Sequence, residues 1–240
     1  MIVIHGENDP ARQCWSLSAD SRFPYATAEG ERCSDQMTVA YGPAAGQWQP
    51  IHPRDARALL GRVSSQWWLT GGWALDLFLG HQGRAHKDLD IGVLRRDIRQ
   101  VLGAMSGWEF FEAKDGKLFG PLTGEPREVV NSLWGRPSHT REWVLELMLD
   151  DSDDDQWVFR RERSIRQALD LAIRHDSARI PYLAPEIQLL YKATHIRRQD
   201  NLDFDRVAPY LDDGARAWLC SALTRMYRQH QWSLALQTNA

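Results

Sequence analysis

Hydrophobic and polar positions follow two different periods along most of this chain. Alternating or short apolar runs predict strands at 67–70, 88–94, 108–113, 117–122, 128–134, 142–149 and 156–160. Spacing of three to four residues predicts helices at 53–63, 72–80, 95–105, 185–192, 202–211 and 213–228, with helical character beginning near residue 164. The first 49 residues show neither period and are rich in Gly, Pro, Ser and Asp.

This layout predicts an α+β fold, in which a mixed sheet is followed by a smaller α-helical C-terminal part. We expect three segments. Residues 1–49 form an extension that is poorly ordered or loosely packed, residues 50–163 form the mixed-sheet domain, and residues 164–240 form the helical domain.

Composition narrows the class of protein. The 240 residues are 43% hydrophobic and 25% charged, as in ordinary globular proteins, and the net charge of −3 disfavours nucleic acid as a partner while still allowing a local basic groove. The three cysteines are widely spaced, which argues against a disulfide framework or a zinc site and favours a cytoplasmic location. Neither a secretory signal nor an apolar run long enough to span a membrane is present.

A pair of acids in the 88–94 segment is the first candidate for chemistry. Strand alternation places Asp88, Asp90 and Gly92 on one face, with Leu89, Ile91 and Val93 facing a core. The two carboxylates can converge on one cation, and Mg²⁺ prefers such oxygen ligands together with phosphate oxygens. Gly92 adds no side chain beside the pair, so we expect room for a nucleotide there.

A glycine pair precedes these acids. Gly71 and Gly72 separate a predicted strand, which ends at Thr70, from a predicted helix. Glycines at such a position let backbone N–H groups approach a phosphate closely, and the helix N-terminus adds a favourable partial charge. The order strand, Gly-Gly, helix, acid-x-acid strand therefore indicates a site for phosphate and metal.

The third acid is expected on another strand. In the 142–149 segment, alternation places Glu142 and Glu146 on one face, and Glu146 lies inside an apolar run where an unpaired carboxylate is costly. Glu146 is the preferred third acid and Glu142 the alternative. The acidic run at 150–155 lacks the glycine and terminal glutamate of a calcium loop, so we expect a solvated turn.

Basic residues must neutralise the phosphates. Arg84 and Lys87 lie in the loop before Asp88, and Lys192 lies among apolar residues of the helix that begins at Pro185. Together with Thr70, Gly71 and Gly72, these three residues are the predicted nucleotide ligands.

These motifs resemble a known superfamily. The run Thr70-Gly71-Gly72-Trp73-Ala74, with Asp88-Leu89-Asp90-Ile91 after it, is similar to the signature of the DNA polymerase beta-like nucleotidyltransferases. Within that superfamily the chain resembles the aminoglycoside and lincosamide nucleotidyltransferases and their uncharacterised bacterial relatives. The likeness extends from about residue 48 to 232 and includes RAHKDLDIGVLRRD, LELMLDD, WVFRR and PYLAPEIQLLYKA. At Thr194, Ile196 and Gln199 this chain lacks the basic residues common in close relatives, which weakens the expected phosphate grip of segment 192–203.

The resemblance implies a function and its residues. Residues 50–163 become the nucleotidyltransferase catalytic domain, Asp88 and Asp90 hold Mg²⁺, and Glu146 ligates a metal or acts as base. The donor is a nucleoside triphosphate, ATP by preference, and the acceptor is a hydroxyl of a small molecule such as an aminoglycoside- or lincosamide-like antibiotic. Acids at 153–155 and 200–205 would then line a cleft for a cationic drug.

Two other functions stay open at this stage. One is a toxin-like nucleotidyltransferase that modifies RNA, which would need a basic groove. The other is a non-catalytic nucleotide-binding module, which would need the loss of a metal ligand.

Overall fold

The computed structural model describes residues 37–40 and 46–238 of the chain. Most of the extension expected at 1–49 therefore lies outside the described residues. Its described part includes strand β1 (Met37–Ala40), which pairs antiparallel with β5 (Lys117–Gly120), and an isolated bridge between Trp48 and Trp143.

A mixed β-sheet carries the fold, as the sequence predicts. Its strands follow the order β1-β5-β4-β6-β7-β3-β2-β11-β10. The remaining members are β2 (Trp67–Leu69), β3 (Asp90–Leu94), β4 (Trp108–Lys114), β6 (Ser132–Pro137), β7 (Leu145–Asp153), β10 (Ile173–His175) and β11 (Pro181–Leu183). The pairs β3–β7 and β2–β11 are parallel, and the other pairs are antiparallel. Two short strands, β8 (Gln156–Val158) and β9 (Arg166–Ala168), extend from the end of β7.

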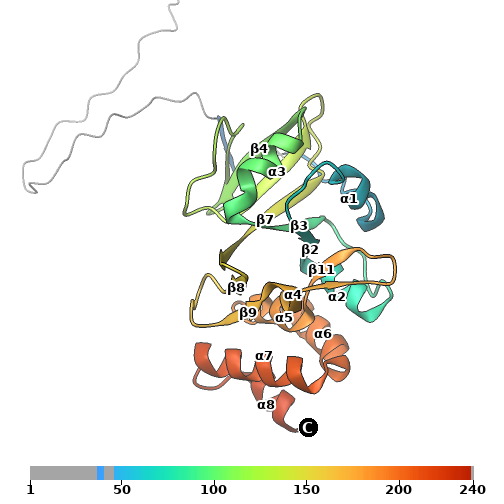
Figure 1. The fold of residues 1–240 in the computed structure, drawn as a ribbon, viewed down its shortest axis with the longest axis vertical. Coiled ribbons are helices and arrows are strands. Elements are labelled where there is room, and N and C mark those ends of the chain that lie inside the picture. Colours follow the sequence, from blue (N-terminus) through green and yellow to red (C-terminus); the bar gives the residue numbers. More distant parts are fainter. Residues whose placement is uncertain (1–36, 41–45, 239–240) are drawn as a thin grey trace, which may run out of the picture. The chain divides into compact units, whose positions relative to one another are not determined.

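Most of the helices overlap the predicted ranges, and α8 is a helix that the sequence analysis did not predict. They are α1 (Pro53–Leu59), α2 (Gly71–Leu79), α3 (Ile98–Ala104), α4 (Leu169–Ala172), α5 (Pro185–Lys192), α6 (Arg198–Val207), α7 (Asp213–Met226) and α8 (Gln231–Thr238), with 3₁₀ turns at Arg95–Asp97 and Ala208–Tyr210. Figure 1 shows α5 to α8 gathered beyond the end of β7 at which β8 and β9 lie. The expected α+β layout, a mixed sheet followed by helices, is therefore confirmed.

Local sequence explains where α2 and α5 begin and end. Gly80 ends α2 in the left-handed region at φ 74°, where a side chain would be strained. Pro185 occupies the first turn of α5, where its missing N–H costs nothing. None of the helices in the described ranges has the length and apolarity that crossing a membrane requires.

The segment after residue 164 differs from the prediction. We expected helix there, but residues 166–183 contain β9, the single turn α4, β10 and β11. Pairing decides this outcome, because β11 lies parallel to β2 and buries Leu183 completely. Prolines at 181 and 185 also interrupt any helix across this stretch.

Strand β7 corrects a second expectation. The strand runs through Asp153, so the predicted solvated turn is reduced to Asp154 and Asp155. Alternation in β7 buries Leu145, Leu147 and Leu149 fully, and Asp150 is also buried at the point where β7 leaves the sheet. A buried acid needs a partner, and the Tyr191 hydroxyl donates a hydrogen bond of 2.5 Å to the Asp150 carboxylate.

Candidate active site

Three carboxylates converge at the junction of β3 and β7. The parallel register pairs Asp90 with Glu146 directly, and Asp88 lies in the bend just before β3. One oxygen of each of Asp88, Asp90 and Glu146 lies within 4.8 Å of the others. Neighbouring residues in adjacent strands project to the same face, which is why residues so distant in sequence meet.

Glu142, the alternative third acid, lies outside this group. It occupies a bend before β7 begins, and its carboxylate accepts a hydrogen bond from the neighbouring Arg141 N–H. The strand therefore brings Glu146 next to the aspartates, whereas Glu142 lies in the segment that precedes the strand.

Burial and repulsion between the acids raise the pKa of Asp90 and of Glu146. Burial raises the pKa of Asp90 well above its ordinary value, and the charges of Glu146 and Asp88 raise it further. Burial also raises the pKa of Glu146 to about 7, with repulsion from Asp88 adding to the shift and a hydrogen bond from the Ser132 hydroxyl opposing it. Three hard oxygen ligands that repel one another are a donor set that fits a divalent cation such as Mg²⁺.

The glycine turn is in contact with these acids. Gly71 has φ of +65°, and a Cβ there would overlap the Asp90 carboxylate. The Thr70 N–H also donates to the Asp90 carbonyl oxygen at 3.0 Å. A Cβ on Gly72 would clash with Arg84 and His86. Both glycines therefore lie in close contact with these side chains, whereas the approach of their N–H groups to a phosphate stays a prediction.

Gln188 of α5 is a residue that the sequence analysis missed. Its Oε1 accepts hydrogen bonds from the Thr70 hydroxyl at 2.7 Å and from the Gly71 N–H at 2.8 Å. Two groups predicted to bind nucleotide are thus engaged by protein, and Gln188 fixes the turn. The only sequence signal was a polar residue on the buried face of α5, where it is 6% exposed.

Lys192 has partners of its own. Its ammonium forms ion pairs with Asp200 at 2.9 Å and with Asp203 at 3.0 Å, and its side chain is 7% exposed. Arg84 lies 3.5 Å from the same Asp203, whereas Lys87 is exposed. Lys192 is therefore less available to a phosphate than Lys87.

One cleft of about 920 Å³ contains all the predicted residues. Its walls include Asp88, Asp90, Glu146, Thr70, Gly71, Gly72, Arg84, Lys87 and Lys192. The cleft also holds residues that we had not assigned, among them Arg160, Arg161, Tyr191 and His195. The first two lie in the WVFRR segment quoted for the resemblance, which was the available signal.

One expectation about the surroundings is wrong. Gly92 does not make room for a nucleotide, because a Cβ there would overlap the buried Trp68 indole. Of the acids expected to line a cleft for a cationic drug, Asp200 does line the catalytic cleft, but it is paired with Lys192. Asp203 is also buried against Lys192, and Asp153 pairs with Arg166 at 2.6 Å.

Comparison with known proteins supports the superfamily. The aminoglycoside-2″-adenylyltransferase family matches residues 54–117, a segment that contains both glycines and both aspartates. A search among curated proteins gave no match.

Three solved structures are similar to this chain. ANT(2″)-Ia in complex with adenylyl-2″-tobramycin shares 14% identity over 72% of this chain and 96% of its own, with a TM-score of 0.49. Lincomycin-bound LnuA, a lincosamide antibiotic adenylyltransferase, shares 18% over 66% and 98%, with a TM-score of 0.46. A solution structure of ANT(2″)-Ia shares 15% over 77% and 86%, with a TM-score of 0.41. Structural likeness of this size does not assign a function, and the family match carries the conclusion. Over the segment that holds Gly71, Gly72, Asp88 and Asp90, the chain is therefore similar to the aminoglycoside-2″-adenylyltransferases, in agreement with the resemblance seen in its sequence.

Proposed function

We propose that the protein transfers a nucleoside monophosphate from a nucleoside triphosphate, ATP by preference, to a hydroxyl of a small molecule in a magnesium-dependent reaction. The observation that carries this proposal is the convergence of Asp88, Asp90 and Glu146 in one cleft beside the Gly71-Gly72 turn. The family match suggests an antibiotic of the aminoglycoside or lincosamide type as acceptor. The cytoplasmic location expected from the cysteines is part of this proposal.

Each residue has a proposed role. Asp88, Asp90 and Glu146 hold Mg²⁺, which would polarise the phosphate under attack and stabilise the leaving pyrophosphate. Arg84 and Lys87 neutralise the triphosphate from the loop before β3. Gln188 holds the turn so that the N-terminus of α2 is available to phosphate oxygens.

The bond changes follow from this arrangement. The acceptor oxygen forms a bond to the α-phosphorus, the bond from that phosphorus to the β-phosphate oxygen breaks, and pyrophosphate leaves. Glu146 takes the proton of the attacking hydroxyl. Most of the catalysis is positioning and charge stabilisation.

The test uses α-labelled nucleoside triphosphates, Mg²⁺ and a panel of aminoglycosides, lincosamides and RNA, with products identified by mass. The expected result is one labelled small molecule and released pyrophosphate, both abolished by EDTA and by Asp90→Asn. Labelled RNA instead would establish the RNA-modifying alternative. Nucleotide binding without any transfer, in the presence of Mg²⁺ and the full panel, would favour the non-catalytic module.

A further inference from the structure

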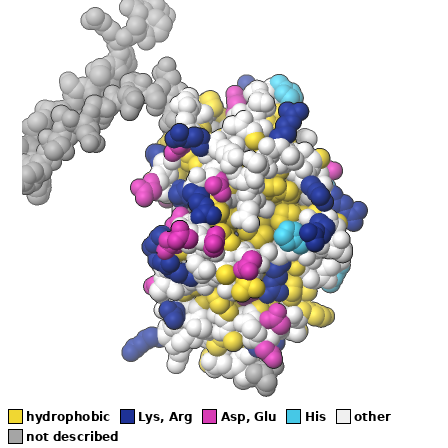
Figure 2. Space-filling view, viewed as in Figure 1, with side chains coloured by type: hydrophobic (Ala, Val, Ile, Leu, Met, Phe, Trp, Pro, Cys, Tyr) yellow, Lys and Arg dark blue, Asp and Glu magenta, His cyan; other side chains and the backbone are white. Residues whose placement is uncertain are grey.

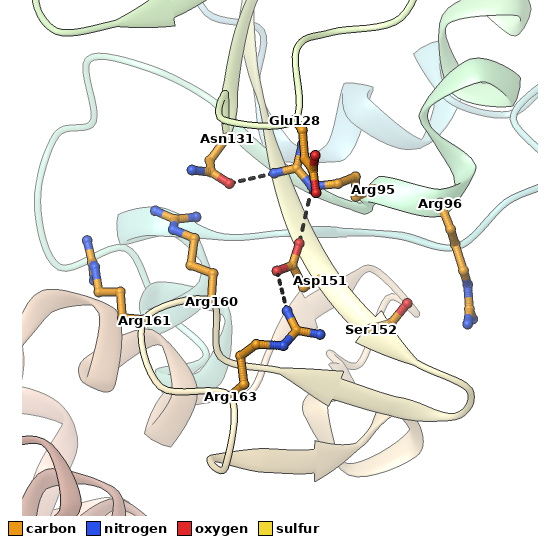
Figure 3. A pocket seen from close by; sticks show the side chains of 9 residues that line it. All are labelled: Arg95, Arg96, Glu128, Asn131, Asp151, Ser152, Arg160, Arg161 and Arg163. Carbon is orange, nitrogen blue, oxygen red and sulfur yellow. Dashed lines mark hydrogen bonds and ion pairs between the residues drawn. The ribbon is translucent and has the colours of Figure 1, made fainter. Parts of the chain in front are cut away.

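A second hollow of about 790 Å³ adjoins the catalytic cleft, and we call it the arginine pocket. Figure 3 shows its lining, which consists of Arg95, Arg96, Glu128, Asn131, Asp151, Ser152, Arg160, Arg161 and Arg163. Five of these residues are arginines and two are acids. Arg160 and Arg161 also line the catalytic cleft, so the two spaces are contiguous. In Figure 2, basic and acidic side chains intermingle on the face shown, over the region of β8 and β9.

The acid at the centre of the arginine pocket is already neutralised. Asp151 accepts from Arg95 at 3.1 Å through one oxygen and from Arg163 at 3.1 Å through the other. Arg95 also donates to the Val130 carbonyl and to the Asn131 side chain. These bonds, of which Figure 3 draws those to Asp151 and Asn131 as dashes, brace the pocket and leave little of its charge for a ligand.

Arg160 and Arg161 have no such partner. In the part of the chain that the structure describes, neither has a carboxylate within ion-pair distance. Arg160 lies over the Tyr191 ring at 5.1 Å, and Arg161 donates to the Thr194 hydroxyl at 2.8 Å. Burial lowers the pKa of Arg161, and the like charge of Arg160 lowers it further. Two adjacent guanidinium groups that repel each other are well suited to a planar or tetrahedral oxyanion.

The position of the pair separates it from the predicted phosphate ligands. Arg84, Lys87 and the glycine turn approach the acids from α2 and the loop before β3. The arginine pocket instead lies at the far end of β7, where Asp151 is five residues beyond Glu146. That separation is about 16 Å along the strand. A molecule whose hydroxyl lies at Glu146 can therefore extend along β7 toward the arginines.

We propose that the arginine pocket, through Arg160 and Arg161, is the subsite for an anionic group of the acceptor, a phosphate or a carboxylate. The acceptor is then a hydroxyl compound that carries negative charge, and this inference replaces the cationic aminoglycoside that the family match suggests. The assignment of this anionic group to the acceptor rests on the proposed function, whereas anion binding by Arg160 and Arg161 does not. Asp200 lines the catalytic cleft but is paired with Lys192 and Arg197, which reduces the negative charge that this part of the wall presents.

The first experiment measures binding without turnover. Inorganic phosphate and acetate are titrated separately into the full chain by calorimetry, and the same is done with Arg160→Gln/Arg161→Gln. We expect the affinity for one of the two anions to fall at least about ten-fold, the loss typical of removed charge-assisted hydrogen bonds. Arg54→Gln/Arg62→Gln removes the same charge from exposed arginines outside both spaces and is expected to change nothing. Equal affinity in the wild type and the Arg160/Arg161 variant would overturn the anion site.

Two further variants separate binding from folding and from the nucleotide. Arg160→Lys/Arg161→Lys keeps the charge, so it is expected to recover part of the anion affinity if the Gln variant is correctly folded. Arg84→Gln/Lys87→Gln is expected to weaken the binding of ATP and to leave the binding of the anion unchanged. If Arg160→Gln/Arg161→Gln weakens the binding of ATP as much as the binding of the anion, the two arginines belong to the nucleotide site and the proposal fails.

The second experiment identifies the acceptor class. Labelled ATP and Mg²⁺ are supplied with a neutral sugar, a sugar phosphate, a uronic acid and a polycationic aminosugar. We expect transfer to one of the two anionic compounds, with a KM raised at least about ten-fold in Arg160→Gln/Arg161→Gln and an unchanged KM for ATP. Transfer to the aminosugar with a KM that ignores these arginines would overturn the acceptor assignment while the proposed function stands. Anion binding that depends on the pair, without transfer to any acceptor, would leave the anion site in place and reject its role in transfer.

Discussion

Two groups of carboxylates in this protein, one half-buried and one buried, differ in what surrounds them. The metal group, Asp88, Asp90 and Glu146, has three acids that face one another. The salt-bridge group, Asp200 and Asp203, has its acids held by Lys192, and Asp200 is also bound by Arg197 at 2.9 Å. Their sequence signals are alike, since each group contains two aspartates a few residues apart. The two groups differ in whether basic side chains of the protein pair with the acids.

The pKa values move in opposite directions for this reason. Burial and repulsion raise the pKa of Asp90, whereas Asp200 has its pKa lowered despite burial, because Arg197 and Lys192 bind the ionised form. Carboxylates that repel one another are suited to binding a ligand such as a cation. Carboxylates that are paired with basic side chains of the protein are suited to stabilising the fold. The comparison gives an opposite expectation for each substitution.

The largest effect is expected for Asp90→Asn. Transfer should fall by at least about 1,000-fold, because a ligand and a charge are lost where charge develops. The free energy of unfolding without metal should not fall, since the substitution removes repulsion. Activity is measured as pyrophosphate release and stability by urea unfolding in EDTA. A marked loss of stability would place Asp90 in the same class as Asp200.

Lys192→Met should produce the reverse pattern. It removes the closest ion pair of Asp203, which keeps the longer ion pairs with Arg84 and Arg206, and one of the two ion pairs of Asp200. We therefore expect the free energy of unfolding to fall by about 3 kcal/mol. The loss should be largest above the ordinary pKa of aspartate and shrink as the pH falls, because the lowered pKa of Asp200 means that its ionised form stabilises the fold. Lys87→Met, at an exposed lysine, is the control and should change stability by less than about 0.5 kcal/mol.

Glu146→Gln tests whether Glu146 is the third acid of the metal group. We expect turnover to fall by about 100-fold while ATP still binds, because the aspartates and the glycine turn remain. Equilibrium binding of ATP with Mg²⁺ is measured beside single-turnover rates. Glu142→Gln is the matched control and should retain turnover, since Glu142 lies before β7. Normal turnover in Glu146→Gln together with loss in Glu142→Gln would reverse the assignment.

The smallest effect is expected for Asp150. In the described part of the chain, its carboxylate is paired with a hydroxyl and not with a basic side chain, so its pairing is intermediate between those of the two groups. Burial raises its pKa to about 6, with the Tyr191 hydrogen bond opposing. Because the unfolded form ionises near pH 4, this residue should cost stability progressively from about pH 4 to 6, by at most about 3 kcal/mol. Asp150→Asn should remove that component, seen as a smaller fall in urea stability between pH 4.5 and 7. An identical pH profile in the variant would show that Asp150 titrates normally.

The sequence was sufficient to predict the three acids that the structure brings together, because local rules determine their positions. Alternation made Glu146 the preferred third acid, and Gly71 and Gly72 were marked by their place between a strand and a helix. These signals depend on two or three neighbouring residues, so they survive without knowledge of the fold.

Residues 166–183 show where local rules fail. Their helical spacing was overridden when β11 paired with β2, because long-range hydrogen bonding and burial outweigh weak local propensity. The same reason explains Gly92. The space that a side chain would take there is filled by the Trp68 indole from the adjacent strand.

The sequence by itself therefore determined the order of elements from β2 to β3, the two aspartates and the class of reaction to which they belong. Only the tertiary structure decided which charges are satisfied. It joined Lys192 to Asp200 and Asp203 and brought Gln188 of α5 to the glycine turn. Among the residues that the structure describes, it also left Arg160 and Arg161 without an ion-paired carboxylate. Charge pairing depends on distances between side chains from different elements, and no periodicity along the chain encodes those distances.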